Sequence, residues 1–236
     1  MANSYVVIDL ETTGLSVKYD KIIEICAIKV INGKIIDKIQ TLVNPEIPIP
    51  MEVTILTGIT DKDVETAPCI DDIIHELIEF CNGFILLGHK IIFDYSFIKR
   101  FAVNAGLTFE KDGIDTLKIA MNLLYDVKPK NLGNLCEYYG IKIEKAHRAF
   151  EDAFATHKLY EKLFFEFGEL FFDEFKAVKL VFNIKKQQKA TKHQKEYLID
   201  LIKYHKIELY VLIEELTRSE ASKMIDKIIS KYGKKR

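Results

Sequence analysis

The sequence predicts an α/β domain, built on a mixed β-sheet flanked by helices, with a small all-α domain after it. Short runs of β-branched residues and runs of helical periodicity follow one another in the first half of the chain, which is typical of α/β proteins. Beyond a polar, Lys-rich stretch, apolar residues recur only at helical spacing. With 236 residues, of which 48% are hydrophobic, the chain can bury a full core.

Three strands open the predicted sheet. The runs 5–8, 22–31 and 34–43 are rich in β-branched and aromatic residues. Between the second and the third run, Asn32-Gly33 supplies the positive φ angles of a tight hairpin turn. We therefore expect a meander in which the second and third strands are antiparallel neighbours.

A loop, two helices and a buried strand are expected next. Residues 44–50 contain three prolines and should form a loop, and Thr60 marks the start of a helix. A helix over about 70–82 follows. The run 84–88 is short, apolar and ends in glycine, as expected of a central strand, and 95–104 then shows helical spacing.

Only helices are expected in the rest of the chain. In the first domain they lie at about 115–125, 131–139 and 148–167. Residues 185–190 are polar and basic without apolar periodicity, which indicates a linker, and Thr191 caps the helix after it. Further helices are predicted at 191–205, 208–216 and 219–232, with Thr217 or Ser219 as the cap of the last. The predicted domains are 1–175, a basic linker at 176–190 and a small helical basic module at 191–236.

Composition argues against several classes of protein. The cysteines are far apart and form no Cys-x-x-Cys pair, which argues against a zinc knuckle and against a disulfide framework. They are Cys26, Cys69, Cys81 and Cys136. The amino terminus shows no basic, cleavable signal, and no run approaches the roughly 18 apolar residues that span a bilayer. We expect a soluble protein of the cytoplasm with no membrane partner.

The net charge of −1 conceals a division of charge along the chain. Residues 176–236 hold 16 Lys and Arg against 7 Asp and Glu, whereas residues 1–175 hold 18 against 28. A basic segment attracts a phosphate backbone and adds salt-sensitive affinity that is independent of base sequence. The alternative is that the lysines only solvate amphipathic helices.

Two acids stand at the end of the first predicted strand. Asp9 and Glu11 are two residues apart, so their side chains project to the same side of the strand. Parallel carboxylates repel one another unless a divalent cation lies between them, and hard cations such as Mg²⁺ prefer carboxylate oxygens. The turn that follows, Thr12-Thr13-Gly14, lets backbone amides approach a ligand closely. Without that turn, an ordinary solvated acid pair is the better explanation of the spacing.

Two later segments place further acids where strands end and helices begin. Asp94 follows the apolar run 84–88 at the entry to a helix. His147 precedes the helix at 148–167, and Asp152 falls within its first turns. Each acid alone is explained by its favourable interaction with a helix dipole, and the histidine by a surface position. It is the three segments in this order that favour a shared metal site.

The three segments together resemble the exonuclease motifs of the DnaQ-like superfamily, in its DEDDh subgroup. The matching residues are Asp9-x-Glu11-Thr-Thr-Gly, then His89 with Phe93-Asp94, then His147-x-Ala149-x-x-Asp152-Ala153. The likeness covers roughly residues 4–165, and the subgroup includes the proofreading epsilon subunit of bacterial DNA polymerase III. The resemblance implies an RNase H-like fold.

The resemblance also implies roles for these residues. Four acids would hold two divalent cations, Mg²⁺ or Mn²⁺, and His147 would act as the general base. The acids are Asp9, Glu11, Asp94 and Asp152. Contacts with the terminal nucleotide are expected from Thr12, Thr13, Gly14, Leu15, His89, Lys90 and Phe93. The family usually has asparagine where this chain has Lys90, which puts the substrate contact at that position in doubt.

The implied activity is release of nucleoside monophosphates from single-stranded 3' ends, with DNA favoured and a role in proofreading or repair. Two alternatives remain open: an RNA 3' exonuclease or oligoribonuclease-like enzyme, and an inactive nucleic-acid-binding subunit. The helical module weakly resembles modules of other nucleic-acid enzymes. A polymerase or another replication or repair protein is a candidate partner, and the sequence leaves the oligomeric state open.

Overall fold

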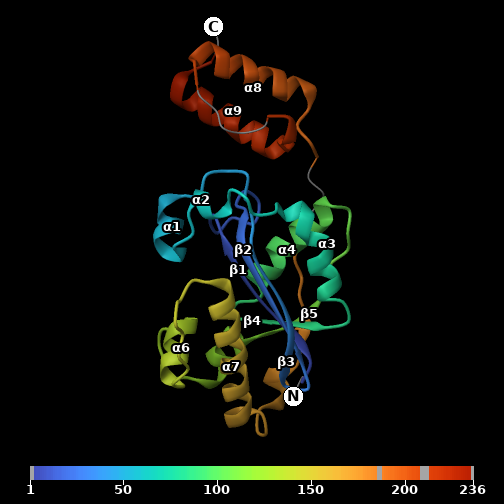
Figure 1. Ribbon diagram of the computed structural model, residues 1–236, viewed down its shortest axis with the longest axis vertical. Coiled ribbons are helices and arrows are strands. Elements are labelled where there is room, and N and C mark those ends of the chain that lie inside the picture. Colours follow the sequence, from blue (N-terminus) through green and yellow to red (C-terminus); the bar gives the residue numbers. More distant parts are fainter. Residues whose placement is uncertain (1–2, 185–187, 208–212, 235–236) are drawn as a thin grey trace. The chain divides into compact units, whose positions relative to one another are not determined.

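The computed structural model describes residues 3–184, 188–207 and 213–234. Contacts divide the chain into two compact units, Met1–Ile184 and Lys185–Arg236 (Figure 1). Among the described residues, no helix is both long and apolar enough to cross a membrane.

Within the described residues, six strands form one mixed sheet in the order β3-β2-β1-β4-β5-β6. The strands are β1 (Tyr5–Thr12), β2 (Ile22–Ile31), β3 (Lys34–Leu42), β4 (Ile85–Gly88), β5 (Asp112–Asp115) and β6 (Val178–Lys179). Strands β1, β4 and β5 are parallel, and the other pairs are antiparallel. The hairpin between β2 and β3 turns at Asn32 and Gly33, with φ angles of 52° and 74°. The predicted meander and mixed sheet are confirmed.

Helices cover both faces of this sheet (Figure 1). The helices of the first unit are α1 (Met51–Thr57), α2 (Asp61–Val64), α3 (Ile70–Phe80), α4 (Ile92–Asn104), α5 (Thr116–Leu123), α6 (Leu132–Tyr138), α7 (Ala149–Phe167) and the 3-10 helix η1 (Phe172–Phe175). Val6 and Ile8 point into the core shared with α3 and α4. Tyr5 and Val7 point to the opposite face, which α7 covers with α5. The alternation along β1 therefore decides which helix each of its side chains meets.

Four elements were not predicted: strands β5 and β6, helix α1 and the 3-10 helix η1. Strand β5 has four residues, two of them aspartate and one glycine, and β6 has only two residues, so neither carries a readable alternation. Helix α1 begins directly after Pro50, at the end of the segment that was correctly expected to be a loop. Helix α4 starts at Ile92, three residues before the predicted range.

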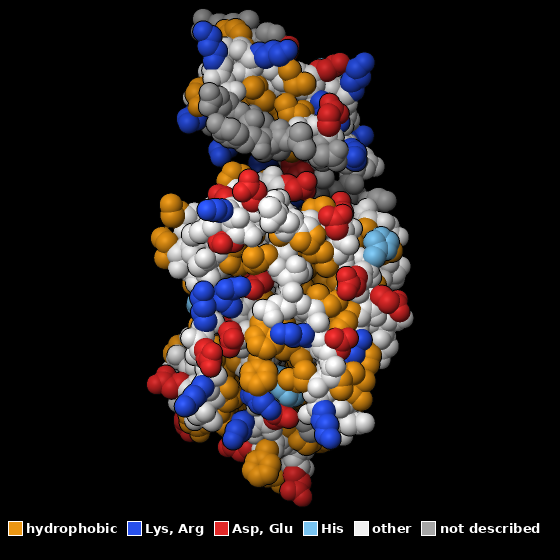
Figure 2. All heavy atoms as spheres, in the orientation of Figure 1, with side chains coloured by type: hydrophobic (Ala, Val, Ile, Leu, Met, Phe, Trp, Pro, Cys, Tyr) orange, Lys and Arg blue, Asp and Glu red, His pale blue; other side chains and the backbone are white. Residues whose placement is uncertain are grey.

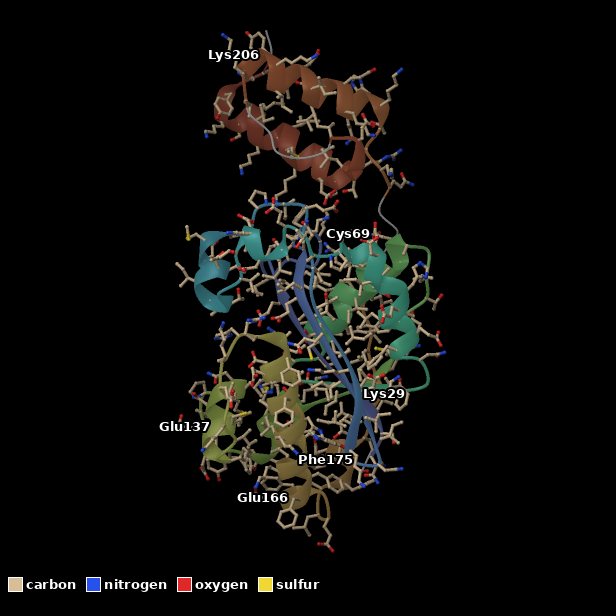
Figure 3. The ribbon with its side chains drawn as sticks, in the orientation of Figure 1. Lys29, Cys69, Glu137, Glu166, Phe175 and Lys206 are labelled. Carbon is tan, nitrogen blue, oxygen red and sulfur yellow. The ribbon has the colours of Figure 1, made fainter. Side chains whose placement is uncertain are left out.

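The first unit extends beyond the predicted boundary at residue 175. Strand β6 pairs with β5, and the Leu180 amide donates to the Lys111 carbonyl at 2.9 Å. Leu180 is buried and packs closely over Gly113, where an added Cβ would lie 2.8 Å from Leu180 Cδ1. Phe175, the last residue of η1, packs against the carboxyl-terminal part of α7 (Figure 3), where its ring centroid is 5.1 Å from that of Phe164. The linker predicted at 176–190 therefore begins too early, because the basic residues beside β6 hide its pairing.

The second unit is a small helical module. Its described helices are α8 (Lys192–His205), the 3-10 helix η2 (Ile213–Glu215) and α9 (Arg218–Tyr232). Capping boxes start the two long helices, one from Thr191 with Gln194 and the other from Thr217 with Glu220. The expected helices near 191–205 and 219–232 are confirmed. Of the helix expected at 208–216, residues 208–212 lie outside the described residues.

Candidate active site

Asp9 and Glu11 lie at the carboxyl end of β1, on the sheet face that α7 covers. They continue the alternation of Tyr5 and Val7, so their side chains point toward the first turn of that helix, where Asp152 lies. One carboxylate oxygen each of Asp9, Glu11 and Asp152 lies within 4.8 Å of the other two. Residues more than 140 positions apart in the sequence thus form one acidic cluster.

Asp94 reaches the same strand from the opposite face. It lies in the first turn of α4 and is buried, and its Oδ1 accepts a hydrogen bond from the Leu10 amide at 3.1 Å. Leu10 stands between Asp9 and Glu11, so this bond holds Asp94 beside the pair. Asp94 is outside the three-residue cluster, yet its charge is the largest electrostatic contribution that raises the pKa of Asp9.

Burial raises the pKa of each of these four acids, and repulsion from other members of the set adds to it for Asp9, Glu11 and Asp94. For Asp9 the main cause is burial, followed by the charges of Asp94, Asp152 and Glu11. Burial and then Asp152 raise the pKa of Glu11 to about 8. Burial is also the first cause for Asp94 and for Asp152. A cluster that resists full ionisation on its own fits a hard divalent cation, which would offset its charge.

His147 lies at the rim of the acidic cluster. It has a φ of 60°, and its amide donates to Asp152 Oδ2 at 3.1 Å. The imidazole also lies close enough to lower the pKa of Asp152, although burial of that carboxyl has the larger and opposite effect. The side chain is exposed, and among the described residues its ring has no hydrogen-bond partner. The ring is therefore free to reach solvent beside the carboxylates.

A buried ion pair, which the sequence analysis missed, anchors α7. Glu24 on β2 is 1% exposed and accepts hydrogen bonds from Arg148 Nε at 3.0 Å and Nη2 at 2.8 Å. It also accepts the Ala149 amide, in the first turn of α7, at 3.0 Å. Glu24 lies opposite Glu11 in the pairing of β2 with β1. The Glu24 side chain therefore ties this part of the sheet to α7, the helix that carries Asp152. A lone glutamate inside the apolar run 22–31 was the available signal.

The turn after β1 is held by its own polar groups. The Thr13 hydroxyl accepts the Lys21 amide at 2.9 Å, and the Thr12 hydroxyl donates to the Gly14 carbonyl at 2.7 Å. A Cβ on Gly14 would lie 2.6 Å from a carboxylate oxygen of Asp20, so the Asp20 side chain packs closely against the turn. Thr13 is buried, whereas Leu15 is 84% exposed. Within this turn, Leu15 is the exposed predicted contact, and Thr13 supports the turn.

The second predicted group of contact residues lies between β4 and α4. His89 Nδ1 is 2.9 Å from Thr116 Oγ1, and its Nε2 is 3.1 Å from the Lys130 carbonyl oxygen. Lys90 is exposed, with a φ of 69°. Phe93 is partly buried, with its ring centroid 5.0 Å from that of Phe97. His89 is therefore engaged in the fold, while Lys90 has a solvent-facing side chain.

Residues 6–160 match the RNase_T family, described as Exonuclease. The chain belongs to this exonuclease family. The chain is 42% identical over 170 residues to the DNA polymerase III PolC-type of Caldanaerobacter subterraneus and 40% identical over 163 residues to that of Bacillus subtilis. These alignments cover 72% and 68% of this chain but only 12% and 11% of the relatives, so the chain spans a small part of their length.

Solved structures show the same fold. Exonuclease X in complex with 5' overhanging duplex DNA is 26% identical, with a TM-score of 0.56, over 70% of this chain and 93% of that one. E. coli Exonuclease I in complex with a dT13 oligonucleotide is 18% identical, with a TM-score of 0.64, over 72% and 43%. The predictions of a DnaQ-like exonuclease and of an RNase H-like fold are confirmed.

Proposed function

We propose that the protein removes nucleotides one at a time from the 3' ends of single-stranded DNA, with Mg²⁺ or Mn²⁺ held by Asp9, Glu11, Asp94 and Asp152. The observation that carries the proposal is that carboxylate oxygens of Asp9, Glu11 and Asp152 lie within 4.8 Å of one another. All three residues belong to the exonuclease motifs and fall within the part of the chain that matches the exonuclease family. Bound cations would lower the pKa of a water molecule and offset charge on the scissile phosphate.

The residues of the chain divide the remaining work. His147 accepts a proton from the attacking water, whose oxygen then bonds to phosphorus. The bond from phosphorus to the 3' oxygen breaks, which releases a nucleoside 5'-monophosphate, and the 3' oxygen takes a proton from solvent to leave a 3' hydroxyl on the shortened strand. Glu24 and Arg148 hold the first turn of α7, so that Asp152 stays in place as charge develops.

DNA is favoured over RNA by the relatives and the fold neighbours. The relatives are DNA polymerases, and the named Exonuclease X and Exonuclease I structures hold DNA. Matched 3'-labelled DNA and RNA strands, incubated with Mg²⁺ or Mn²⁺, test this directly. Release of monophosphates from DNA is expected, and faster release from RNA would favour the alternative RNA exonuclease. No release with either cation would favour the inactive binding subunit, whereas equal rates for an Asp9→Ala variant would show that the acidic cluster does not catalyse the release.

His147 should be essential to the chemical step. We expect His147→Asn to lower kcat by about 10²- to 10⁴-fold, because it removes the general base. KM should change little, because the substitution removes no side chain that is proposed to bind the substrate. Asparagine tolerates the positive φ angle at this position, so the backbone bond to Asp152 is kept. Single-turnover rates with and without added imidazole measure the effect. Retention of more than a tenth of the wild-type rate would exclude the proposed role.

The helical module should add affinity for the DNA backbone. Residues 185–236 carry 14 Lys and Arg against 7 Asp and Glu. On the face that Figure 2 presents, these cations lie at separate points of the unit and not in one patch. The excess of positive charge would add affinity that is independent of base sequence. We also propose a polymerase or another replication or repair protein as a partner and a cytoplasmic location, consistent with the DNA polymerase relatives.

A chain that ends at Ile184 tests the module. We expect it to bind a single-stranded oligonucleotide more weakly than the full chain, with a shallower dependence of log Kd on log salt, because fewer cations are released. Ending the chain at 175 is unsuitable, since it removes β6 and buried Leu180 from the first unit. Fluorescence polarisation at several salt concentrations is the measurement. Equal affinity and slope would favour lysines that only solvate the helices, or a protein-docking role.

A further inference from the structure

A cavity of about 610 Å³ lies at the carboxyl ends of β4 and β5. Three lysines and three apolar residues account for most of its lining: Lys90, Lys128, Lys130, Leu117, Met121 and Leu132. Its volume is that of a site for a small organic ligand, larger than a single phosphate needs. Strand ends of parallel sheets are where such ligands bind.

The cavity is electropositive in a unit that is acidic as a whole. Residues 1–184 hold 20 Lys and Arg against 28 Asp and Glu, yet none of the described residues that line the cavity is acidic. No ion pair with a described residue engages the side chain of Lys90, Lys128 or Lys130. The Lys130 ammonium donates to the Val127 carbonyl at 2.8 Å, which leaves its charge uncompensated. The local field therefore attracts an anion.

Hydrogen bonds fix the walls of the cavity. The Lys90 amide donates to Asp115 Oδ1 at 2.8 Å, which supports a φ angle of 69° that is uncommon for a residue other than glycine. His89 joins Thr116, at the start of α5, to the carbonyl of Lys130. The segments that carry the lysines are thus tied to each other, and the cavity is part of the folded unit.

The cavity is close to the chemistry. Lys90 precedes Asp94 by four residues, and the Phe93 amide donates to the Lys90 carbonyl at 2.9 Å, so about one helical turn separates them. A nucleotide strand whose 3' end lies at the carboxylates continues past them with further phosphates and bases. The three lysines can bind phosphates of such a strand, and the apolar residues of the lining can pack against its bases.

We propose that this cavity binds the sugar-phosphate backbone of the substrate strand on the 5' side of the scissile bond. Lys90, Lys128 and Lys130 contact phosphates, while Leu117, Met121 and Leu132 pack against a sugar or base. The assignment rests on the proposed function, because it describes a second part of the same substrate. It also gives Lys90 a function, contact with a phosphate, at a position where the family usually has asparagine.

The test separates this cavity from the catalytic centre by substrate length. The p-nitrophenyl ester of thymidine 5'-monophosphate occupies only the catalytic centre, whereas a thymidine oligonucleotide also reaches the cavity. We expect Lys128→Gln with Lys130→Gln, in the full chain, to weaken oligonucleotide binding about tenfold. The slope of log Kd against log salt should fall by about 1.4, the value for two phosphate contacts on a single strand.

A matched pair of substitutions controls for the loss of charge. Lys34→Gln with Lys162→Gln removes the same two charges from exposed sites away from the cavity, and we expect wild-type affinity and slope. An equal loss of affinity in this pair would overturn the proposal, as would an equal loss of kcat/KM on the ester and on the oligonucleotide in the Lys128 and Lys130 variant. Binding is measured with EDTA, without turnover. Absence of hydrolysis by the wild type would thus count against the proposed function alone.

Discussion

Glu11→Gln is expected to abolish exonuclease activity and to stabilise the protein in cation-free buffer. Loss of one carboxylate from the cluster should lower the rate by about 10²- to 10⁴-fold, since divalent cations are worth several kcal/mol to a phosphoryl transition state. The same substitution removes a buried charge that is repelled mainly by Asp152. Activity and stability should therefore change in opposite directions.

The stability effect has a defined dependence on pH. The pKa of Glu11 is raised to about 8 in the folded protein, against roughly 4.3 in an unfolded chain. Between these values the folded state binds more protons, so the free energy of unfolding falls as pH rises. The stabilisation relative to wild type should be absent below about pH 4.3 and should reach the order of 5 kcal/mol at pH 8.

Urea denaturation with EDTA, at several pH values, measures this effect. Addition of Mn²⁺ should raise the stability of the wild type strongly and that of Glu11→Gln weakly, because bound cations offset the repulsion. Glu76→Gln, at an exposed position in the middle of α3, is the matched control and should behave as wild type. A wild-type pH profile in Glu11→Gln would contradict the electrostatic account of the site.

Glu24→Gln is expected to lower both stability and activity, although Glu24 is not one of the predicted site residues. The substitution leaves the Arg148 guanidinium without its carboxylate and weakens the bond to the Ala149 amide. Breaking a fully buried ion pair costs about 3–5 kcal/mol, and we expect a smaller loss here because the Arg148 side chain is 29% exposed. Asp152 lies in the helix turn that this contact holds, so the affinity for Mn²⁺ should fall as well.

A double-mutant cycle with Arg148→Gln distinguishes positioning from general destabilisation. The Glu24→Gln, Arg148→Gln double variant carries no unpaired charge and should recover most of the lost stability. Its Mn²⁺ affinity and kcat should remain low, because two neutral amides hold α7 less firmly than the bidentate pair. Glu137→Gln, exposed on α6, should change nothing. Full recovery of kcat in the double variant would show that Glu24 serves stability alone.

Elements with a strong local signal were predicted from the sequence. The β-branched runs of β1 to β3 and the Asn32-Gly33 turn specify the meander, since period and turn chemistry act over a few residues. Strands β5 and β6 escaped prediction because two to four residues hold no period. Their place depends on partners distant in the sequence, such as the contact of Leu180 with Gly113.

The sequence by itself determined that Asp9 and Glu11 share one side of a strand end, which follows from the two-residue period of a strand. Their motif, with those of Asp94 and Asp152, also identified the exonuclease family. Only the tertiary structure decided that β1 turns this pair toward α7, where Asp152 completes the cluster within 4.8 Å. It also revealed the buried Glu24 contact and the basic cavity, because both join segments whose proximity depends on packing of the whole sheet.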